Sequence, residues 1–582
     1  MIGRFPILDI SPVVEFGGEL VGAKAIVNEE LKVSATIIRE GHDGFSAFVI
    51  LLDPKGKEFS RAAMRETWPK SSRYEATIKP NALGNWSYFI EVVAQNPGEF
   101  AKELNSQSAI FPIYVERERA LVGSWYEFFP RSEGAIKNSD GTITSGTFAT
   151  AAKRIPAVAQ MGFDVLYLPP IHPIGYSHRK GKNNSLEASP TDPGVPWGIG
   201  NADGGHDAIN PELGSMKDFE EFVKVAKKNK IEIALDLALQ CSPDHPWVKS
   251  NPEWFTKRAD GTIAYAENPP KKYQDIYPIN FDNDYPNLFA EIYRVVTFWI
   301  EKGISIFRVD NPHTKPVHFW QELIAKINAK YPEVIFLSEA FTVPAMMHAL
   351  GKAGFQQSYT YFTWRTTKQE LMDYGNEVAH HTSAFFRPNF WVNTPDILPF
   401  HLQSGNPAIF AMRAVLASTL TPSWGMYAGY ELYEHIPIAE GKEEYRDSEK
   451  YEIKVRDWQA AEKKGLSLAP FISALNQIRR DNPALQRLRN LHFHPTDSDQ
   501  VIAYSKREGD NLLLMVVNLD GVHAQETMVH WDMWALGLAS EEFEVKDLLD
   551  GSKYSWSKDT YVRLNPARPN GQVAHIALVK TK

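Results

Sequence analysis

The segment ISIFRVD at residues 304–310 has the composition of a buried β-strand that ends in charged residues. Its isoleucine, phenylalanine and valine residues favour β-structure, whereas Arg308 and Asp310 occupy its C-terminal end. The segment NPHTK follows at residues 311–315, so we expect the strand to end before it. In α/β barrels, residues at the C-terminal ends of parallel strands form the active site. Asp310 is therefore a candidate functional residue.

Two further segments have the same form. Residues 334–340 read VIFLSEA and carry Glu339, and residues 389–396 read NFWVNTPD and end in Asp396. In both segments an apolar run precedes the acid. Because the C-terminal ends of parallel strands share one edge of the sheet, we expect the three carboxylates to converge on one rim.

Strand-like and helical patterns alternate between residues 113 and 485, as they do in a parallel barrel. Helical patterns occur at residues 151–161, 216–228, 287–302 and 468–480. The predicted strands are residues 122–129, 164–168, 231–237, 304–310, 334–340, 359–362, 389–396 and 423–427. This number of units predicts an α/β fold, a (β/α)8 barrel.

The two ends of the chain have a different pattern. Residues 1–112 and 486–582 contain short apolar runs separated by turn residues, which predicts a β-sandwich domain at each end. Inside the barrel domain, at about residues 172–213, lies a polar stretch rich in glycine and proline with little periodicity. A connection this long is usually functional or a small subdomain. We expect an excursion subdomain after strand three or in the loop that precedes it.

The composition excludes several classes of protein. The 582 residues are 43% hydrophobic with a net charge of −9, which provides no basic surface for nucleic acid or anionic membrane. The single cysteine, Cys241, excludes an internal disulfide and suits a reducing compartment. The sequence shows no secretory signal and no long apolar span. We therefore expect a cytoplasmic enzyme.

A single acid at a strand end is more often a cap or a surface ion pair than a catalytic group, but three acids at strand ends favour catalysis. Two carboxylates that flank the scissile bond are the minimum for retaining glycosyl transfer, because one attacks the anomeric carbon and the other protonates the leaving group. Arg308 is placed to keep Asp310 ionised, as a nucleophile requires. Apolar neighbours are expected to raise the pKa of Glu339, as a general acid requires.

These residues resemble a known family. Asp236, Arg308 with Asp310, Glu339 and Asp396 match the short sequence regions of the α-amylase superfamily (glycoside hydrolase family 13) in type and order. Longer motifs resemble the GlgE-type α-1,4-glucan:maltose-1-phosphate maltosyltransferases over nearly the whole chain. They are PPIHPIG at 169–175, ENPPKKYQDIYPINFD at 267–282, FRVDNPHTKP at 307–316, FLSEAFTVP at 336–344, NTPDIL at 393–398 and EEYRDSEKYEIKVRDW at 443–458.

The resemblance implies retaining transfer of a maltosyl unit from α-maltose 1-phosphate to the non-reducing end of an α-1,4-glucan or maltooligosaccharide, with release of phosphate. It implies Asp310 as nucleophile, Glu339 as acid/base and Asp396 as transition-state stabiliser. Substrate-binding positions that match by resemblance are Lys180, Gln240, Asn268, Lys271, Tyr273, Arg308, Asn311, Lys450 and Tyr451. Of these, Asn268, Lys271, Tyr273 and Asn311 are expected to bind the phosphate. Taken alone, the NPPKKYQ segment is more typical of a solvated proline-rich loop.

Several departures limit what the resemblance implies. Gln240-Cys241 and Thr394-Pro395 replace pairs that ordinary amylases use for sugar and calcium, which makes a plain hydrolase and a calcium site less expected. His380, His381 and His401 lack metal-ligand spacing, so we expect no metal and no cofactor. Val195 stands where some members have serine, which removes one hydroxyl near the phosphate. Members often carry a helical insertion where this chain has only residues 96–111, so a homodimer is expected on weaker grounds.

Two alternatives remain from the sequence alone. One is another enzyme of the superfamily, a glucan hydrolase or a disaccharide phosphorylase. The other is a glucan-binding protein without activity on an amylase-like fold, which the presence of all three acids disfavours. The fold cannot decide between them, because one fold hosts many functions.

Overall fold

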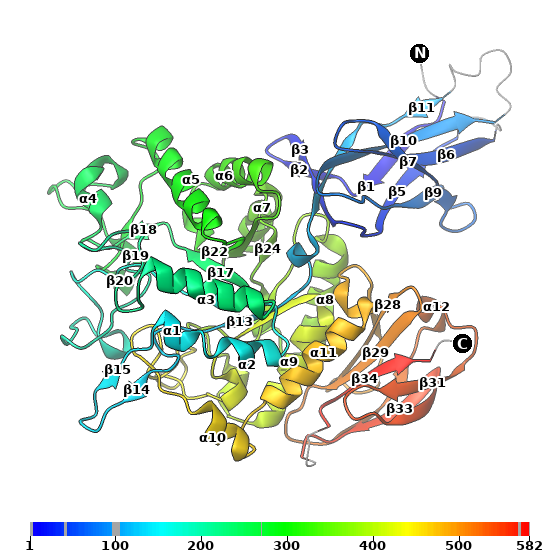
Figure 1. Cartoon of the computed structure of the whole chain (residues 1–582). Coiled ribbons are helices and arrows are strands. Elements are labelled where there is room, and N and C mark those ends of the chain that lie inside the picture. Colours follow the sequence, from blue (N-terminus) through cyan, green and yellow to red (C-terminus); the bar gives the residue numbers. More distant parts are fainter. Residues whose placement is uncertain (1–3, 40–43, 96–104, 269–270, 568–571, 581–582) are drawn as a thin grey trace.

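The computed structural model describes residues 4–39, 44–95, 105–268, 271–567 and 572–580. A barrel forms the middle of the chain, and a β-rich domain lies at each end (Figure 1). Figure 1 shows the N-terminal domain in blue and the C-terminal domain in orange and red, both against the same side of the barrel. Within the described residues, no helix combines the length and the apolar character that crossing a membrane requires.

Eight parallel strands form the barrel, as the sequence predicted. In chain order they are β13 (Gly123–Glu127), β16 (Val165–Leu168), β17 (Glu232–Leu237), β22 (Ile306–Asp310), β23 (Ile335–Glu339), β24 (Gln357–Ser358), β25 (Phe390–Trp391) and β26 (Ser423–Tyr427). Hydrogen-bonded neighbours follow the order β24-β23-β22-β17-β16-β13-β26-β25. A parallel bridge between Ser358 and Pro388 links the two end strands. The sheet therefore closes on itself and leaves no free edge.

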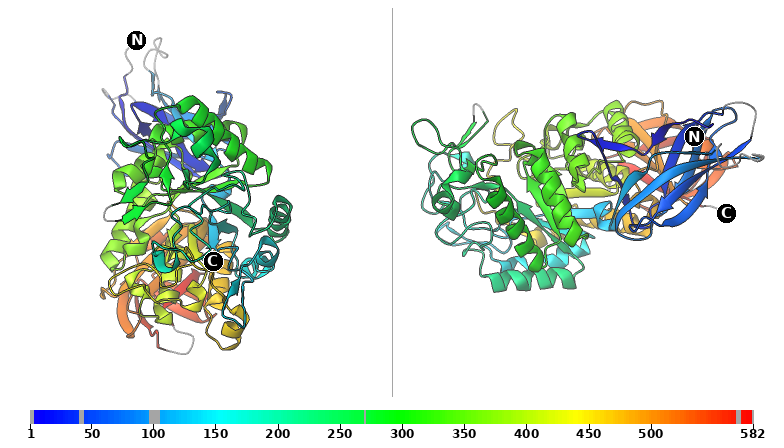
Figure 2. Two further views of the ribbon diagram at one scale, coloured as in Figure 1. Left: turned by 90° about the vertical axis from the view of Figure 1, so that its left-hand side faces the viewer. Right: turned by 90° about the horizontal axis from the view of Figure 1, so that it is seen from above.

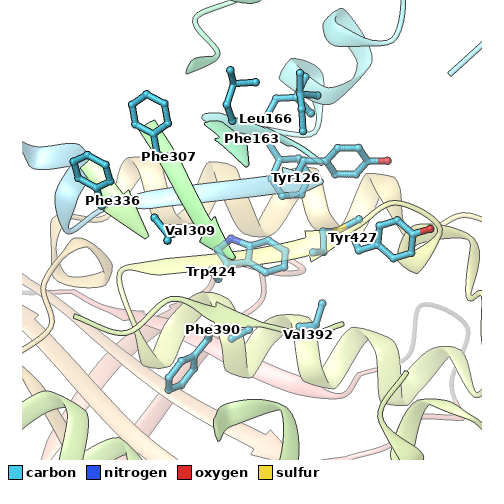
Figure 3. Close-up of a cluster of buried hydrophobic side chains, with 14 of the residues drawn as sticks. Tyr126, Phe163, Leu166, Phe307, Val309, Phe336, Phe390, Val392, Trp424 and Tyr427 are labelled. Atoms are coloured by element: carbon cyan, nitrogen blue, oxygen red, sulfur yellow. The ribbon is translucent and has the colours of Figure 1, made fainter. Parts of the chain in front are cut away.

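The strands alternate between an interior face and a face that packs against helices. Ile306 belongs to the cluster inside the barrel, together with Trp125, Tyr167, Ala234, Ile335, Leu337, Tyr359 and Trp391. Phe307 and Val309 point the other way and pack in the surrounding layer, with Phe336 beside them (Figure 3). Because side chains alternate along a strand, Arg308 and Asp310 share the interior face with Ile306. The polar end of β22 thus caps the apolar barrel interior.

Helices surround the barrel. They are α3 (Met216–Lys228), α5 (Tyr285–Glu301), α6 (Val317–Lys330), α7 (Pro344–Ala353), α8 (Lys368–Asn376), α9 (Pro407–Leu420) and α11 (Ala469–Asp481). Helix α3 illustrates how the local sequence specifies these helices. Ser215 and Asp218 form a capping box at its start, and its buried face consists of Phe219, Phe222 and Ala226. Helix α9 is buried along its length from Phe410 onward, because it packs between the barrel and the C-terminal domain.

The structure corrects some of the predicted elements. The sixth strand was predicted at residues 359–362, which is wrong: β24 covers Gln357–Ser358, and Tyr361–Trp364 forms a short 3-10 helix. The side chain of Thr360 accepts a hydrogen bond from the Phe362 amide and so starts that helix. The helix predicted at 151–161 is interrupted, giving α1 (Phe148–Ala151) and α2 (Ile155–Gln160).

Two long excursions cover the C-terminal ends of the strands. The first lies between β16 and α3 and contains the predicted segment 172–213, with one short 3-10 helix at Lys182–Asn184. The second lies between β17 and α5. It comprises β18 (Gln240–Cys241), α4 (Pro246–Ser250), the paired strands β19 (Ala266–Asn268) and β20 (Lys271–Tyr273), and β21 (Tyr277–Pro278). Excursions therefore occur both before and after the third strand, the two places that the sequence suggested.

The N-terminal domain packs two sheets face to face. One sheet contains β1 (Ile7–Ser11), β5 (Leu31–Ile37), β9 (Arg73–Ile78) and β8 (Arg65–Glu66). The other contains β4 (Ala23–Ile26), β12 (Phe111–Glu116), β10 (Gly84–Ala94), β6 (Phe45–Leu52) and β7 (Glu58–Ala63), with β11 (Ser106–Gln107) beside β10. Val33, Val49 and Ile90 belong to the shared core between them.

The C-terminal domain contains a six-stranded sheet and a two-stranded sheet. The larger has β27 (Leu491–His494), β28 (Val501–Glu508), β29 (Asn511–Asn518), β34 (Ala574–Val579), β31 (Glu542–Asp547) and β32 (Lys553–Ser557), and the smaller has β30 (Gln525–His530) and β33 (Asp559–Leu564). Arg489 joins the domains, because its guanidinium contacts Glu29 and donates to the carbonyls of Lys24 and Ser383, both at 2.9 Å. Figure 2 shows the same arrangement from two further directions.

Candidate active site

The ends of β22 and β23 bring two carboxylates together. Asp310 and Glu339 are partners in the parallel register of these strands, so they occupy equivalent positions on neighbouring strands. Neighbouring strands lie about 4.8 Å apart, and side chains at paired positions point to the same face. The register therefore places both carboxylates side by side at the rim of the barrel, where the sequence predicted them.

One guanidinium holds three acids at this rim. Arg308 Nη1 lies 2.9 Å from Asp310 Oδ1 and 2.9 Å from Asp236 Oδ2. Arg308 Nη2 lies 3.3 Å from Glu339 Oε1. The arginine is buried, and such charge-assisted contacts are among the stronger hydrogen bonds in proteins. The planar guanidinium fixes the relative orientation of Asp236, Asp310 and Glu339, which a lysine in its place cannot do.

Two residues outside the predicted set of site residues also contact Asp236. The Tyr167 hydroxyl and the Trp197 indole N–H donate to Asp236 Oδ2, at 2.6 Å and 3.2 Å. Burial raises the pKa of Asp236 to about 7, although the Arg308 charge opposes this. The strand pattern of 164–168 would have placed Tyr167 on the interior face, whereas Trp197 lies in an irregular loop that carries no such signal.

Glu339 has the environment expected of a general acid. Burial, and secondarily the charge of Asp310, raise its pKa to about 7 against the opposing effect of Arg308. The predicted rise is thus confirmed, with removal from water as its main cause. The backbone N–H of Asn311 donates to Glu339 Oε2 at 3.1 Å, and its side-chain amide donates to Asp310 Oδ2 at 3.3 Å. Asn311 therefore contacts both acids.

Asp396 belongs to a loop rather than to a strand end. Strand β25 ends at Trp391, and a bridge between Thr394 and Ile397 forms a turn that presents Asp396 to the cavity. Its carboxylate accepts a hydrogen bond from Lys450 Nζ at 2.6 Å, and 46% of its side chain is exposed. Burial acts against the charge of Lys450, but the contact with Asp396 outweighs it and raises the pKa of Lys450.

A cavity of about 730 Å³ lies above these groups. Its walls combine the strand ends with both excursions and the loops around Asp396 and Lys450. Sequence-predicted residues that line it are Lys180, Gln240, Tyr273, Asp310, Asn311, Glu339, Asp396, Lys450 and Tyr451. Val195 also lines the cavity, and Arg308 contacts Asp310 and Glu339 from within the barrel. The side chains of Asn268 and Lys271 lie outside the described residues.

Lys180 and Gln240, one from each excursion, each have a hydrogen bond to a backbone carbonyl. Lys180 is buried and its ammonium donates to the backbone carbonyl of Lys272 at 3.4 Å, which links the two excursions. Gln240 donates to the carbonyl of Trp197 at 3.2 Å. Both side chains retain hydrogen-bonding capacity toward the cavity. Such convergent polar groups in a concave site are typical of ligand binding.

One cluster has the composition of a metal site. The ligand atoms of His206, Cys241 and His245 lie within 4.8 Å of one another, and all three residues are buried. Each ring nitrogen already has a partner: His206 Nδ1 contacts His245 Nε2 at 3.0 Å, His206 Nε2 contacts the Ala238 carbonyl at 2.8 Å, and His245 Nδ1 accepts from Trp247 N–H at 3.0 Å. Burial lowers the pKa of His206 to about 4 and that of His245 to about 2. The contacts fit two neutral histidines in a structural network.

Comparison with known proteins decides the family. The chain is 49% identical to α-1,4-glucan:maltose-1-phosphate maltosyltransferase 1 of Streptomyces coelicolor, over 99% of this chain and 96% of that protein. It is 46% identical to the enzyme of Corynebacterium glutamicum over 99% and 96%. The chain belongs to the family of α-1,4-glucan:maltose-1-phosphate maltosyltransferases. The alignment with the first relative spans 655 positions against the 582 residues of this chain, so that member of the maltosyltransferase family is longer.

Two family models agree with this assignment, and solved structures show the fold. The model of domain N/S of α-1,4-glucan:maltose-1-phosphate maltosyltransferase matches residues 3–109, and the model of the GLGE C-terminal domain matches residues 493–579. Among solved structures, the maltogenic α-amylase AmyB of Thermotoga neapolitana has a TM-score of 0.60 at 17% identity, and it covers 80% of this chain and 99% of its own. The α-amylase of Geobacillus thermoleovorans has a TM-score of 0.61 at 16% identity. These two likenesses show that this chain has the fold of α-amylases.

Proposed function

We propose that this chain transfers a maltosyl unit from α-maltose 1-phosphate to the non-reducing end of an α-1,4-glucan and releases phosphate. The observation that carries the proposal is the pairing of Asp310 with Glu339 on neighbouring strands, with Arg308 between them, in a chain of the maltosyltransferase family. Retaining transfer requires two carboxyl groups close to the anomeric carbon, one as nucleophile and one as acid/base. Adjacent strand ends meet that requirement.

In the first half of the reaction, Asp310 attacks the anomeric carbon of the donor. The bond from that carbon to the phosphate oxygen breaks, and Glu339 gives its proton to the departing oxygen. A pKa of about 7 for Glu339 keeps a large fraction of this acid protonated near neutral pH. The products are a β-maltosyl ester of Asp310 and free phosphate, with Glu339 ionised.

In the second half, ionised Glu339 removes the proton of the acceptor 4-hydroxyl, and that oxygen attacks the anomeric carbon of the ester. The bond to Asp310 breaks, so the nucleophile and the protonated acid are both restored. Two inversions give overall retention. Asp396, held by Lys450, is placed to stabilise positive charge on the sugar ring in both transition states.

The remaining residues that match by resemblance divide between sugar and phosphate. In this proposal Lys180, Gln240, Lys450 and Tyr451 bind sugar hydroxyls, whereas Asn268, Lys271, Tyr273 and Asn311 bind the phosphate. Val195 supplies no hydroxyl to the phosphate. No metal or other cofactor takes part. A cytoplasmic location and a homodimer complete the proposal, and they rest on the sequence.

Phosphate release from α-maltose 1-phosphate, with and without maltohexaose, tests the proposal. We expect release that depends on the acceptor, with products that grow by two glucose units in mass spectra. Shortening of maltohexaose without any donor would indicate a glucan hydrolase. Phosphate release that depends on a different disaccharide donor would indicate a different transfer reaction. Binding of maltohexaose without turnover would indicate a glucan-binding protein.

A further inference from the structure

The cations around the cavity differ in what already neutralises them. Arg308 contacts three carboxylates, and Lys450 contacts Asp396 at 2.6 Å. Lys315 also lines the cavity, but its ammonium donates only to backbone carbonyls, those of Asp310 at 3.4 Å and Asn311 at 3.2 Å. Among the described residues, Lys315 forms no ion pair with a carboxylate. Its positive charge is thus available to an anionic ligand.

The position of Lys315 is fixed by a turn that touches both catalytic acids. Asn311 has a left-handed backbone, with φ of 43° and ψ of 52°, and Thr314 Oγ1 donates to its carbonyl at 2.8 Å. This turn brings Lys315 back beneath the nucleophile, while the Asn311 N–H holds Glu339 Oε2. An ammonium has three donors, and two of them are used by the carbonyls. The third remains for the cavity.

We propose that Lys315 binds the phosphate group of the donor and stabilises it as it leaves. The inference rests on the proposed function and adds a residue to the phosphate site. Glu339 protonates the oxygen that bridges sugar and phosphate, so the phosphate lies on the side of Glu339. The turn of Asn311 is the backbone segment that contacts that acid. A lysine at this place meets the negative charge that develops on the leaving group.

The alternative is that Lys315 only supports the turn. Burial lowers the pKa of Lys315, and the charges of Asp310 and Glu339 oppose that effect. The ammonium is therefore partly removed from water and close to the charges of both acids. A turn-supporting lysine would affect every reaction of Asp310 equally. A phosphate-binding lysine would matter only for a donor that carries phosphate. Donors with different leaving groups therefore distinguish the two roles.

The experiment compares two donors, α-maltose 1-phosphate and α-maltosyl fluoride, with maltohexaose as acceptor. For Lys315→Met we expect kcat/KM to fall about 10- to 100-fold with the phosphate donor, the size of one hydrogen bond to a charged group. With the fluoride donor we expect little change. Lys315→Arg should restore most of the lost rate, because it keeps the charge. The matched control is Lys249→Met on the exposed surface of α4, which should leave both donors unaffected.

Each other outcome has a definite meaning. Equal losses with both donors would assign Lys315 to turn support and overturn the inference, as would no loss with either donor. Inactivity of the wild-type enzyme on α-maltose 1-phosphate would overturn the proposed function together with the inference. If Lys315→Met fails to fold, Lys315→Gln and the reverse reaction replace it. There the half-saturating concentration of inorganic phosphate should rise about 10-fold or more while that of the glucan stays constant.

Discussion

The two halves of the candidate site are held in different ways. Asp310 and Glu339 stand at strand ends, are largely buried and share the Arg308 guanidinium. Asp396 and Lys450 come from loops, and the Asp396 side chain is 46% exposed. Buried, multiply bonded groups cannot reorient when the substrate binds, whereas the partly exposed Asp396 can exchange its lysine partner for a sugar hydroxyl. The strand-borne half is therefore suited to the bond-making and proton-transfer steps, and the loop-borne half to contacts with the sugar.

Removal of the nucleophile should have the largest effect. We expect Asp310→Ala to lower transfer by at least about 10⁴-fold, because no covalent intermediate can then form. The control is Asp140→Ala, in an exposed turn where the carboxylate accepts hydrogen bonds from the Thr142 backbone and hydroxyl. Far-ultraviolet circular dichroism should show both variants folded. Near-normal turnover of Asp310→Ala would contradict the strand-borne mechanism.

Replacement of the acid should give the next largest effect. Glu339→Gln should lower transfer from the phosphate donor by about 10²- to 10⁴-fold. In the wild type, donor cleavage should decline as the pH rises through about 7, because Glu339 must be protonated for that step. Single-turnover phosphate release between pH 5 and 9 measures this limb. A rate that stays constant across this range would exclude Glu339 as the acid of this step.

The same carboxyl predicts a change in stability. The folded pKa of Glu339 is raised from 4.5 to about 7, so the folded state retains a proton that the unfolded state has lost between these values. The contribution of Glu339 to the free energy of unfolding should therefore fall as the pH rises from 4.5 to 7. Glu339→Gln lacks this contribution, so its free energy of unfolding relative to that of the wild type should be about 3 kcal/mol higher at pH 8 than at pH 4. Thermal unfolding of both proteins at the two pH values measures this difference. A constant difference would contradict the assignment.

Arg308→Lys should have the third largest effect on transfer. One ammonium cannot maintain contacts to Asp236, Asp310 and Glu339 at once, so about two charged hydrogen bonds are lost and kcat should fall about 10²- to 10³-fold. The KM should change less than kcat, because the arginine acts through the acids. Arg480→Lys in α11 is the control. Its partly exposed guanidinium contacts Asp164, which directly precedes β16 and so lies at the end of the barrel opposite the acids. Equal losses in both variants would indicate a general effect on folding.

The sequence predicted most of the strand-borne half. The β-favouring residues of segment 304–310 predicted a strand with Arg308 and Asp310 at its C-terminal end, and the apolar run before Glu339 located the next strand. Asp396 was also predicted from an apolar run, although the strand itself ends at Trp391. Lys180 and Lys450 followed only from resemblance, because no periodicity relates them to the barrel. Lys315 belongs to the NPHTK segment that follows the strand, yet its place in the cavity depends on the left-handed backbone of Asn311. The wrong sixth strand had a similar cause, since Thr360 starts a 3-10 helix inside a run that favours β-structure.

Lys450→Met should have the smallest effect and should appear mainly in KM. The ammonium bonds an exposed carboxylate, and such ion pairs add at most about 1 kcal/mol to stability, so the variant should fold normally. Its loss frees Asp396 and removes one donor to the sugar, which should raise KM for α-maltose 1-phosphate about 10-fold. Lys217→Met on the exposed side of α3 is the matched control. A fall in kcat as large as that of Arg308→Lys, with KM unchanged, would show that Lys450 acts on the transition state rather than on substrate binding.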